Sequence, residues 1–297
     1  MKLTFLGTGA MQPTKERNLS AISLRYESEN ILFDCGEGTQ RQMKIAELKP
    51  TKLTRVILSH FHADHVLGLG GLLRNLEAND YQNTLQIYGP KGLEKFMTNI
   101  INSAHEGTNL KIKLTEIKPG IIINEEKFTI EALPLAHSVL SFGFIFQEKE
   151  KRKINLEYLK KFNLAQDPIL GDLQKGKDIV WEGKKISAKK ATILVPGKKI
   201  GFIFDTGVCE NCIKVGKNAD LLISESTFSS KEQEKAKEYK HLSSIDAAKI
   251  AKKAKAKKLI LTHFSQRYKD VEVLKEEAKK IFPDVECAKD FLEIDIQ

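Results

Sequence analysis

The 297-residue sequence predicts an α/β protein that folds as one continuous domain. Short apolar runs rich in β-branched and aromatic residues alternate along the chain with stretches in which apolar residues recur at helical spacing. Neither a fixed-period repeat nor a linker rich in proline, glycine or serine divides the chain. A chain of this length buries a substantial core, so the sequence indicates a single domain over residues 1–297.

Ten apolar runs are expected to form β-strands, because most of them end at a polar or glycine-containing turn. In chain order these expected strands span residues 2–8, 21–26, 30–36, 55–60, 85–90, 128–135, 142–147, 200–207, 221–227 and 259–264. Five stretches with helical periodicity lie between them, at residues 36–49, 66–76, 92–104, 243–258 and 272–282. Ser243 or Ser244 is expected to cap the fourth of these helices.

The chain is basic, with 48 Lys and Arg against 39 Asp and Glu, a formal net charge of +9. This balance permits a polyanionic partner without demonstrating one, since such a charge often reflects a solvated surface. Twelve Lys and Arg against six Asp and Glu fall between Lys149 and Lys190, which gives this segment a net charge of +6. The segment is expected to be an inserted arm at about 149–190, and its composition alone favours a charged surface hairpin.

The N-terminus reaches Gly7 and Gly9 before an apolar run of signal-peptide length develops, and no later run approaches the roughly 18 residues of a membrane span. We therefore expect a cytoplasmic protein without a membrane partner. The four cysteines are too few for a disulfide framework and fit a reducing compartment. Cys209 and Cys212 form only half of a structural zinc site, and we expect them to lie in a plain loop.

A dense cluster of potential metal ligands follows the expected strand at residues 55–60. In a short loop, potential ligands alternate with other residues, so that their side chains can point at one locus while the backbone turns. These potential ligands are His60, His62, Asp64 and His65. Neutral imidazoles suit zinc, and a carboxylate adds an anionic ligand. This pattern predicts a metal site.

Further ligands are needed, because four side chains in one loop cannot complete the coordination of two metal ions. His137, Asp205 and His263 each come directly after an apolar run, and each alone would more often be a turn residue. Together with the first cluster they use five of the seven histidines. No role is assigned to His105.

With these residues the chain resembles the metallo-β-lactamase superfamily, and within it the ribonuclease Z family of endonucleases that remove the 3′ trailer of precursor tRNA. The His-x-His-x-Asp-His motif marks only the superfamily, whereas "PTKERN", "GEGTQRQ" and "HFSQRY" are more specific to the family. The segments that carry the resemblance span residues 5–21, 32–42, 59–65, 134–144, 204–207, 219–228 and 261–268. The resemblance implies a four-layer αββα sandwich with a binuclear metal site at one edge of two packed sheets.

The resemblance also implies a division of the metal ligands. One ion is expected on His60, His62 and His137, and the second on Asp64, His65 and His263, with Asp205 bridging the two. Two Zn²⁺ per chain would lower the pKa of a shared water, so that a metal-bridged hydroxide attacks the phosphodiester. Asp64 is expected to orient that water or to accept its proton.

The departing ribose oxygen needs a proton, since an in-line displacement separates the incoming and outgoing oxygens. In the family a glutamate and a histidine from two further motifs supply it, and Glu225 and His241 match those positions. Ser224, Ser226 and Leu242 depart from the usual family pattern beside them. For each residue alone, a strand-end carboxylate and a polar residue at a helix start are the simpler interpretations.

Several residues match family positions that contact the substrate. Arg267, with Ser265 and Tyr268 beside it, is expected at the scissile or a neighbouring phosphate, because a guanidinium binds phosphate bidentately. Arg17 and Asn18 are expected to shape the pocket for the tRNA 3′ end, or else to stabilise a turn. Asp34 is expected to support the metal-binding loop without being a ligand.

In the family an arm between the His137 and Asp205 motifs grips the tRNA and commonly acts on the partner subunit. The basic arm lies in this interval, so the resemblance implies a precursor tRNA partner and a homodimer. Two other classes stay open: a hydrolase of small thioesters, lactones or β-lactams on the same scaffold, and a non-catalytic RNA-binding protein.

Overall fold

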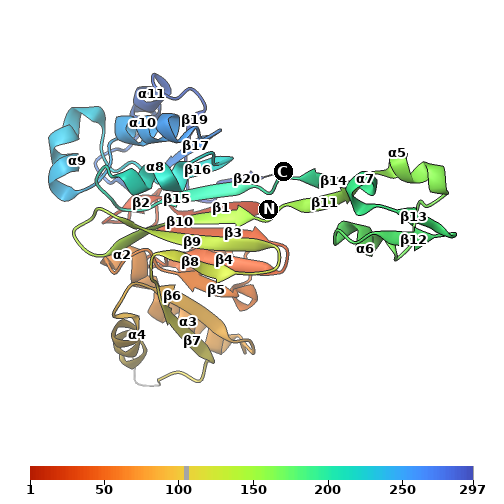
Figure 1. Cartoon of the computed structure of the whole chain (residues 1–297). Coiled ribbons are helices and arrows are strands. Elements are labelled where there is room, and N and C mark those ends of the chain that lie inside the picture. The colour runs from red at the N-terminus through yellow and green to blue at the C-terminus, as the bar shows by residue number, and fades with distance from the viewer. Residues whose placement is uncertain (104–106, 297) are drawn as a thin grey trace.

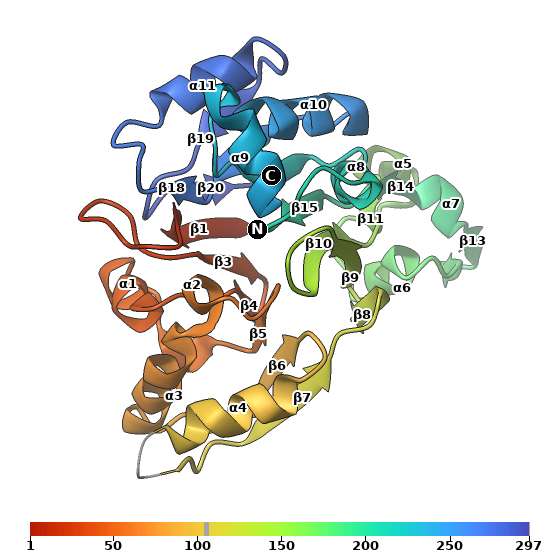
Figure 2. The ribbon, with the colours of Figure 1, turned by 90° about the vertical axis from the view of Figure 1, so that its left-hand side faces the viewer.

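The computed structural model describes residues 1–103 and 107–296, and His105 lies outside the described residues (Figure 1). Two seven-stranded sheets pack face to face, with helices on both outer faces (Figures 1 and 2). This is the four-layer αββα sandwich of the metallo-β-lactamase type that the sequence resemblance implied. None of the helices in the described residues has the length and apolar composition that membrane crossing requires.

The first sheet has the strand order β20-β1-β3-β4-β5-β6-β7. Its strands are β1 Lys2–Gly7, β3 Ala21–Tyr26, β4 Glu29–Phe33, β5 Arg55–Ile57, β6 Leu85–Gly89, β7 Ile112–Glu116 and β20 Glu293–Asp295. The pairs from β20 to β4 are antiparallel and those from β4 to β7 are parallel. Its outer face carries the helices α1 Thr39–Ile45, α2 Ala63–Val66, α3 Gly68–Ala78 and α4 Leu93–Asn102, with the 3₁₀ turn η1 Pro50–Lys52.

The second sheet repeats this arrangement in the order β19-β17-β16-β15-β10-β9-β8. Its strands are β8 Gly120–Asn124, β9 Phe128–Leu135, β10 Ser141–Glu148, β15 Lys199–Ile203, β16 Leu221–Glu225, β17 Leu259–Thr262 and β19 Val285–Cys287. The pairs from β8 to β15 are antiparallel and those from β15 to β19 are parallel. The helices on this side are α8 Glu210–Gly216, α9 Gln233–Tyr239, α10 Ser244–Ala254 and α11 Glu272–Lys279, and the 3₁₀ turn η3 Ser230–Glu232 precedes α9.

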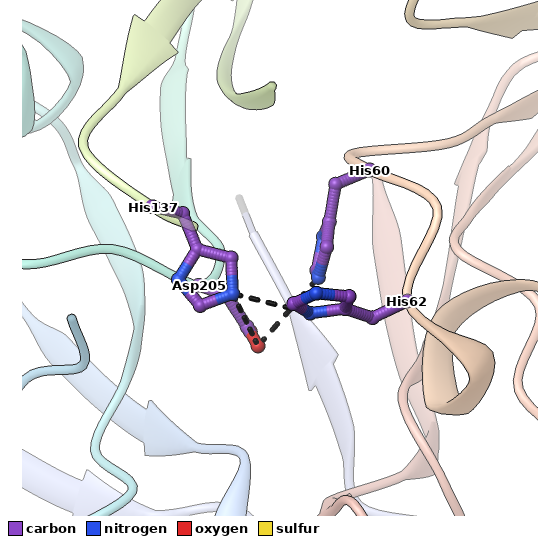
Figure 3. Close-up of side chains that lie close together, drawn as sticks. All are labelled: His60, His62, His137 and Asp205. Atoms are coloured by element: carbon purple, nitrogen blue, oxygen red, sulfur yellow. Dashed lines mark hydrogen bonds and ion pairs between the residues drawn. The ribbon is translucent and has the colours of Figure 1, made fainter. Parts of the chain in front are cut away.

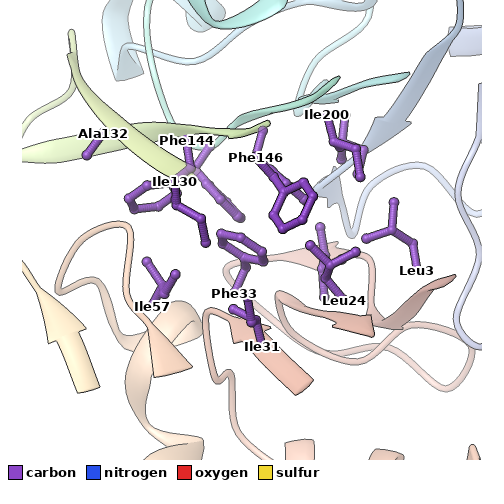
Figure 4. Close-up of a cluster of buried hydrophobic side chains, with 14 of the residues drawn as sticks. Leu3, Leu24, Ile31, Phe33, Ile57, Ile130, Ala132, Phe144, Phe146 and Ile200 are labelled. Atoms are coloured by element: carbon purple, nitrogen blue, oxygen red, sulfur yellow. The ribbon is translucent and has the colours of Figure 1, made fainter. Parts of the chain in front are cut away.

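Three apolar interfaces hold the four layers together. In β4, Ile31 and Phe33 point between the sheets (Figure 4). Phe33 stacks there on Phe202 of β15 at a centroid distance of 4.2 Å. Leu32, between them in sequence, points to the helices instead. In β16 of the second sheet, Leu222 likewise points to the helices that cover that sheet. Because both faces of these strands are buried, their sequences are almost continuously apolar, which is why they were predictable.

All ten expected strands are confirmed, and so is the cap of α10. The Ser243 hydroxyl accepts from the Asp246 N–H, and the Asp246 side chain accepts from the Ser243 N–H in return. The expectation of a plain loop around Cys209 and Cys212 was wrong. Cys209 is the N-cap residue of α8, and Cys212 lies within the helix. The helix forms because Cys212 and Val215, three residues apart, both pack into the apolar layer below α10.

The expectation of a simple charged hairpin for the basic arm was also wrong. The arm leaves the second sheet after β10 on a two-stranded stalk of β11 Lys151–Ile154 and β14 Thr192–Val195, so it extends beyond the predicted end at residue 190 (Figure 1). Beyond the stalk lie α5 Leu156–Leu159, η2 Lys160–Phe162, α6 Leu170–Gln174, β12 Ile179–Trp181, β13 Lys184–Ile186 and α7 Ala188–Ala191. Leu159, Leu173 and Ile186 are buried in a small apolar cluster within the arm, which gives it a core of its own.

Candidate metal centre

The seven predicted ligands converge at one end of the two sheets, although they come from four separate parts of the chain. The loop after β5 and the short helix α2 supply one cluster, and the loops after β9, β15 and β17 supply the others. The parallel strands β5, β15, β16 and β17 all deliver their carboxyl ends to this edge. The structure thus brings together all of the following residues: His60, His62, Asp64, His65, His137, Asp205 and His263.

The first group contains His60, His62, His137 and Asp205, and one ligand atom of each lies within 4.8 Å of the others. His137 Nε2 is 3.2 Å from His62 Nδ1, and Asp205 Oδ2 is 3.7 Å from His60 Nε2. Figure 3 shows these side chains pointing toward a common point from opposite sides. Three imidazole nitrogens and a carboxylate oxygen at such separations form a donor set typical of zinc.

The second group contains Asp64, His65 and His263. His263 Nε2 is 3.2 Å from His65 Nε2 and 3.3 Å from Asp64 Oδ2. Asp205 faces this group with its other oxygen, since Oδ1 lies 3.4 Å from both His65 Nε2 and His263 Nε2. One carboxylate therefore presents one oxygen to each group, as a ligand shared between two cations would.

Two buried atoms support cation binding independently of the motif. Among the described residues, His60 Nε2 and Asp205 Oδ1 have no hydrogen-bond partner although both are buried. Leaving such atoms without a partner costs about 1–3 kcal/mol each. A cation held between them would remove that cost, so the side chains fit divalent metal ions.

Hydrogen bonds to the Nδ1 atoms leave the Nε2 atoms of four histidines free to bind metal. His65 Nδ1 donates to Asp34 at 2.6 Å, and His137 Nδ1 donates to the Lys240 carbonyl at 3.0 Å. His60 Nδ1 lies 2.9 Å from the Ser59 hydroxyl, and His263 Nδ1 lies 3.0 Å from the Thr227 hydroxyl. Both hydroxyls donate elsewhere, Ser59 to Asp34 and Thr227 to Glu225, and therefore accept from the rings. Such partners fix the tautomer and raise ligand basicity.

Asp34 supports the metal-binding loop, as the sequence predicted. Its fully buried carboxylate accepts from the Ser59 N–H at 2.7 Å and from the Ser59 hydroxyl at 2.8 Å, in addition to His65. The loops also pack backbone to backbone here. A side chain at Gly68 would lie 2.0 Å from the carbonyl oxygen of Gly36, so glycine is required there.

Backbone strain gathers around the same centre. Met11, Asp34, Lys240 and His263 have φ values of 61°, 56°, 54° and 59°, in the left-handed region that non-glycine residues seldom adopt. Each such residue costs of order 1 kcal/mol or more, and strain of this kind is typical of functional sites. At Met11 the turned backbone directs its N–H to Asp64 Oδ2 at 2.8 Å.

Beside the two groups, Glu225 and His241 form a hydrogen-bonded pair. His241 Nδ1 lies 2.9 Å from Glu225 Oε1 and 3.9 Å from Asp205 Oδ2. Burial lowers the pKa of His241, but the Glu225 and Asp205 carboxylates raise it more strongly, to about 9. In the absence of metal ions, His241 is therefore protonated at neutral pH.

A cavity of about 790 Å³ opens over the metal groups. His241, Ser265 and Arg267 line it, together with the exposed side chains of Met11 and Tyr239. The Arg267 guanidinium lies 5.1 Å from the centre of the Phe228 ring and forms an ion pair with Glu232. The cavity thus joins the candidate metal centre, an imidazole and a guanidinium, which together suit a phosphate ester.

Comparison with known proteins identifies the family. A curated relative named Ribonuclease Z, from Methanothermobacter thermautotrophicus, is 36% identical over 299 residues, which cover 100% of this chain and 97% of the relative. Another Ribonuclease Z, from Nitrosopumilus maritimus, is 38% identical and covers 100% of each chain. The chain belongs to the ribonuclease Z family. A family model described as "Anti-Pycsar protein Apyc1" also matches it, over residues 1–283.

A solved structure agrees with membership of the ribonuclease Z family. The crystal structure of human tRNase Z, short form, matches with a TM-score of 0.75 and 31% sequence identity, and the match covers 100% of both chains. The match therefore extends through the whole chain.

Three of the residues predicted to contact substrate in this ribonuclease Z family member form hydrogen bonds to other residues of the protein instead. Arg17 donates to the Tyr268 carbonyl at 2.5 Å, and the Asn18 side-chain amide donates to the Glu37 carbonyl at 2.9 Å. The Tyr268 hydroxyl accepts from the Ser229 N–H at 2.8 Å and donates to Glu232. Ser265 and Arg267 line the cavity. Among the described residues that line it, Arg17, Asn18 and Tyr268 are not included. The geometry favours the alternative interpretation of Arg17 and Asn18, a network that stabilises a turn.

Sequence reasoning missed several supporting residues of the ribonuclease Z site. Thr227 bonds Glu225 and His263, Ser59 bonds Asp34 and His60, and Glu232 holds Arg267. Ser59 and Thr227 lie within two residues of a predicted site residue, and this proximity was the available signal. Glu232 gave no such signal, because it lies 35 residues from Arg267 in sequence.

Proposed function

We propose that this protein is a metal-dependent endoribonuclease that removes the 3′ trailer of precursor tRNA, cutting after the discriminator nucleotide and leaving a 3′-hydroxyl on the tRNA. The sharing of the Asp205 carboxylate between two ligand groups carries this proposal, because it indicates the two-cation arrangement that phosphodiester hydrolysis uses. Full-length similarity to proteins named Ribonuclease Z and to human tRNase Z, short form, supplies the substrate class.

The metal ions are proposed to be two Zn²⁺. His60, His62 and His137 would hold one and Asp64, His65 and His263 the other, with Asp205 contacting both. Bound there, the ions would lower the pKa of a water molecule toward neutrality and offset negative charge on the phosphate. Nitrogen donors outnumber oxygens in this set, which favours zinc over magnesium or calcium.

Asp64 is proposed to orient the attacking water and accept its proton. Its Oδ2 atom is held by the Met11 N–H and faces His263 and His65 at 3.3 and 3.4 Å. These contacts fix the carboxylate at the floor of the cavity. A carboxylate so fixed can act as a general base without reorganisation.

His241 is proposed to donate a proton to the departing ribose oxygen. Its Nδ1 is engaged by Glu225, which leaves Nε2 as the ring atom for substrate, and the side chain lines the cavity. Glu225 is a positioning residue in this scheme, because it is fully buried and acts through the imidazole. Proton donation by a positioned imidazole typically contributes about 10²–10⁴ to the rate.

Arg267 is proposed to bind the scissile phosphate or its neighbour. Stacking on Phe228 and pairing with Glu232 hold the guanidinium plane at the cavity wall. A planar guanidinium can bind two phosphate oxygens at once. Ser265 lies beside it, since its hydroxyl accepts from Arg267 Nε at 3.0 Å.

The basic arm is proposed to contact the tRNA, and a homodimer would allow it to do so near a metal centre. Strand β10 runs from Ser141 beside the site to Glu148 at the arm, and eight extended residues span about 26 Å. The arm therefore projects from the end of the sheet opposite the site (Figure 1). From there the arm would contact a part of the tRNA distant from the cleaved bond, or the metal site of a second subunit. The exposed lysines that would face phosphates are at positions 151, 153, 160, 161, 175, 177, 184, 185, 189 and 190.

The test incubates zinc-loaded protein with a precursor tRNA carrying a short 3′ extension, and in parallel with a chromogenic ester and a thioester. We expect one cut after the discriminator nucleotide and a tRNA product that accepts 3′ end labelling through its hydroxyl. Asp205→Ala serves as the inactive control. Hydrolysis of the esters alone would indicate a small-molecule hydrolase, and binding of tRNA without any hydrolysis would indicate a non-catalytic RNA-binding protein.

A further inference from the structure

Cys209 and Cys212 lie in contact at the start of α8, close to the metal centre but outside it. Their sulfur atoms are 3.4 Å apart. Cys209 is half-buried, whereas Cys212 is completely buried on the inner face of the helix. The pair therefore combines an accessible thiol with a protected one.

The environment of the pair favours thiol chemistry over metal binding. Among the described residues, no third metal-binding side chain joins the two cysteines in a cluster. The hydrogen bond from the Cys212 thiol lowers the pKa of Cys209 to about 5 and raises that of Cys212. Attack on a disulfide requires a thiol with solvent access, which the half-buried Cys209 has and the fully buried Cys212 lacks.

We propose that Cys209 and Cys212 form a reversible dithiol–disulfide pair whose oxidation weakens metal binding at the adjacent centre. The oxidant is a small-molecule disulfide such as oxidised glutathione. The Cys209 thiolate attacks one of its sulfurs, forming a mixed disulfide and releasing one thiolate. Cys212 then loses its proton and attacks the Cys209 sulfur, releasing the second thiolate. Two cysteine thiols are oxidised, and one disulfide is reduced to two thiols.

The loop from Asp205 to Cys209 links this pair to the metal ligands. The Thr206 hydroxyl lies 3.9 Å from Cys209 Sγ and accepts from the Ala136 N–H at 3.0 Å. The Gly207 N–H donates to the Ala136 carbonyl at 2.7 Å, one residue before His137. Movement of this loop thus displaces Asp205 directly and His137 through Ala136.

Oxidation must move the loop more than the helix. A disulfide bond is about 2.05 Å long, so the two sulfurs must approach from their present 3.4 Å. Cys212 is held within the apolar layer, and Asn211 Nδ2 donates to the Pro134 carbonyl at 2.7 Å, which anchors α8. Cys209 lies at the end of the loop and has to move. Disturbing the groups that support metal ligands typically costs about 10–100-fold in metal affinity.

The experiment treats the full-length, reduced protein with increasing ratios of oxidised to reduced glutathione. Free thiols are counted and the intact mass is measured, with and without subsequent reduction by dithiothreitol. We expect loss of two of the four thiols and a mass lower by two hydrogens, both reversed by reduction. Cys209→Ser should abolish this intramolecular bond. Cys287→Ser, a change at another half-buried cysteine near the same apolar layer, should leave it intact.

Zinc affinity is then measured by chelator competition for the reduced and the oxidised protein. We expect affinity to be at least about 10-fold lower after oxidation and to recover on reduction. Retention of all four thiols under oxidising ratios would overturn the proposal, and so would equal zinc affinity in the two states. This coupling rests on the proposed metal centre, whereas the thiol count does not. A protein that binds no zinc but forms the disulfide would therefore locate the failure in the proposed function.

Discussion

His241 Nδ1 lies 2.9 Å from Oε1 of the fully buried Glu225. The same carboxylate accepts from the Thr206 N–H at 2.9 Å and from the Thr227 N–H and hydroxyl at 3.2 and 2.7 Å. Glu225 is therefore held by the loops that follow β15 and β16, and it fixes both the orientation and the tautomer of His241. Under the proposed function, the two ligand groups would hold metal and His241 would handle the proton.

His241→Ala should keep metal and slow the chemical step by about 10²-fold or more. The imidazole binds Glu225 through Nδ1, so its removal leaves the two ligand groups unchanged. Single-turnover cleavage of precursor tRNA and elemental analysis of the same sample check both parts. Loss of zinc to the extent seen in Asp205→Ala would contradict this division of roles.

Asp205→Ala and His62→Ala should each lose metal and activity together. Asp205 contacts both groups, and His62 contributes a nitrogen 3.2 Å from His137 Nε2. Zinc content after dialysis against a weak chelator and cleavage rate are the measurements. Asp284→Ala, which changes an exposed aspartate far from any ligand, is the matched control and should behave as wild type. Full zinc occupancy in Asp205→Ala would refute the shared-carboxylate interpretation.

Stability of the metal-free protein should depend on pH through His241. Its pKa is raised from 6.5 to about 9 by Glu225 and Asp205 against the opposing effect of burial. Folding therefore binds a proton here, and the resulting stabilisation is complete below pH 6.5 and is lost as the pH rises through 9. Urea unfolding of chelator-treated protein should show the free energy of unfolding falling over this range. Glu225→Gln should reduce this fall, and an unchanged pH profile would exclude Glu225 as the cause.

Most of the fold could be predicted, since strands buried on both faces have almost continuously apolar sequences. The strands β7, β8, β19 and β20 were missed because they are short or half-exposed, as in Glu293–Asp295. The core of the arm was missed because Leu159, Leu173 and Ile186 are scattered among lysines and meet only in three dimensions. A composition-based prediction weighs charge, and it cannot detect seven apolar side chains folding onto one another.

Four of the proposed metal ligands could be predicted because their spacing is local and their chemistry is narrow, and the other three because each directly follows an apolar run. Of the residues that support these ligands, only Asp34 was predicted, and Ser59 and Thr227 offered no signal beyond their proximity to predicted site residues. Thr227 is an ordinary residue in sequence, and only the structure shows it between Glu225 and His263. The ion pair of Glu232 with Arg267 likewise joins distant segments. The family resemblance left open whether Arg17 shapes the substrate pocket or stabilises a turn, and in the structure its guanidinium donates to the Tyr268 carbonyl.

Arg267→Lys should lower kcat/KM for precursor tRNA by about 10-fold or more while zinc content is unchanged. A lysine keeps the charge but loses the planar pair of donors and the stacking on Phe228. A charge-assisted hydrogen bond contributes roughly 1.5–3 kcal/mol, and 1.4 kcal/mol corresponds to a factor of ten. Steady-state kinetics check this, with Arg25→Lys at an exposed position as the control. Equal effects of the two substitutions would mean that Arg267 contributes charge alone.

Deleting the arm should leave the fold and the metal centre intact but weaken tRNA binding. Its apolar cluster is separate from the others, and the strands that flank it are already paired, with Gln147 opposite Lys199. A short Gly-Ser turn in place of residues 150–197 can therefore close β10 onto β15. Melting temperature and zinc content should stay close to those of the wild type.

The salt dependence of tRNA affinity decides whether the arm binds phosphates. Each phosphate neutralised adds about 0.7–0.9 to the negative slope of log K against log salt concentration. If several exposed lysines of the arm contact phosphates, its deletion should make this slope shallower by several units and lower the affinity most strongly at low salt. Lys184→Glu combined with Lys185→Glu, at exposed arm positions, should act in the same direction without removing the arm core. A slope that is the same with and without the arm would mean that the tRNA is held by the domain around the metal centre, and the net charge of +6 would then be only a solvated surface.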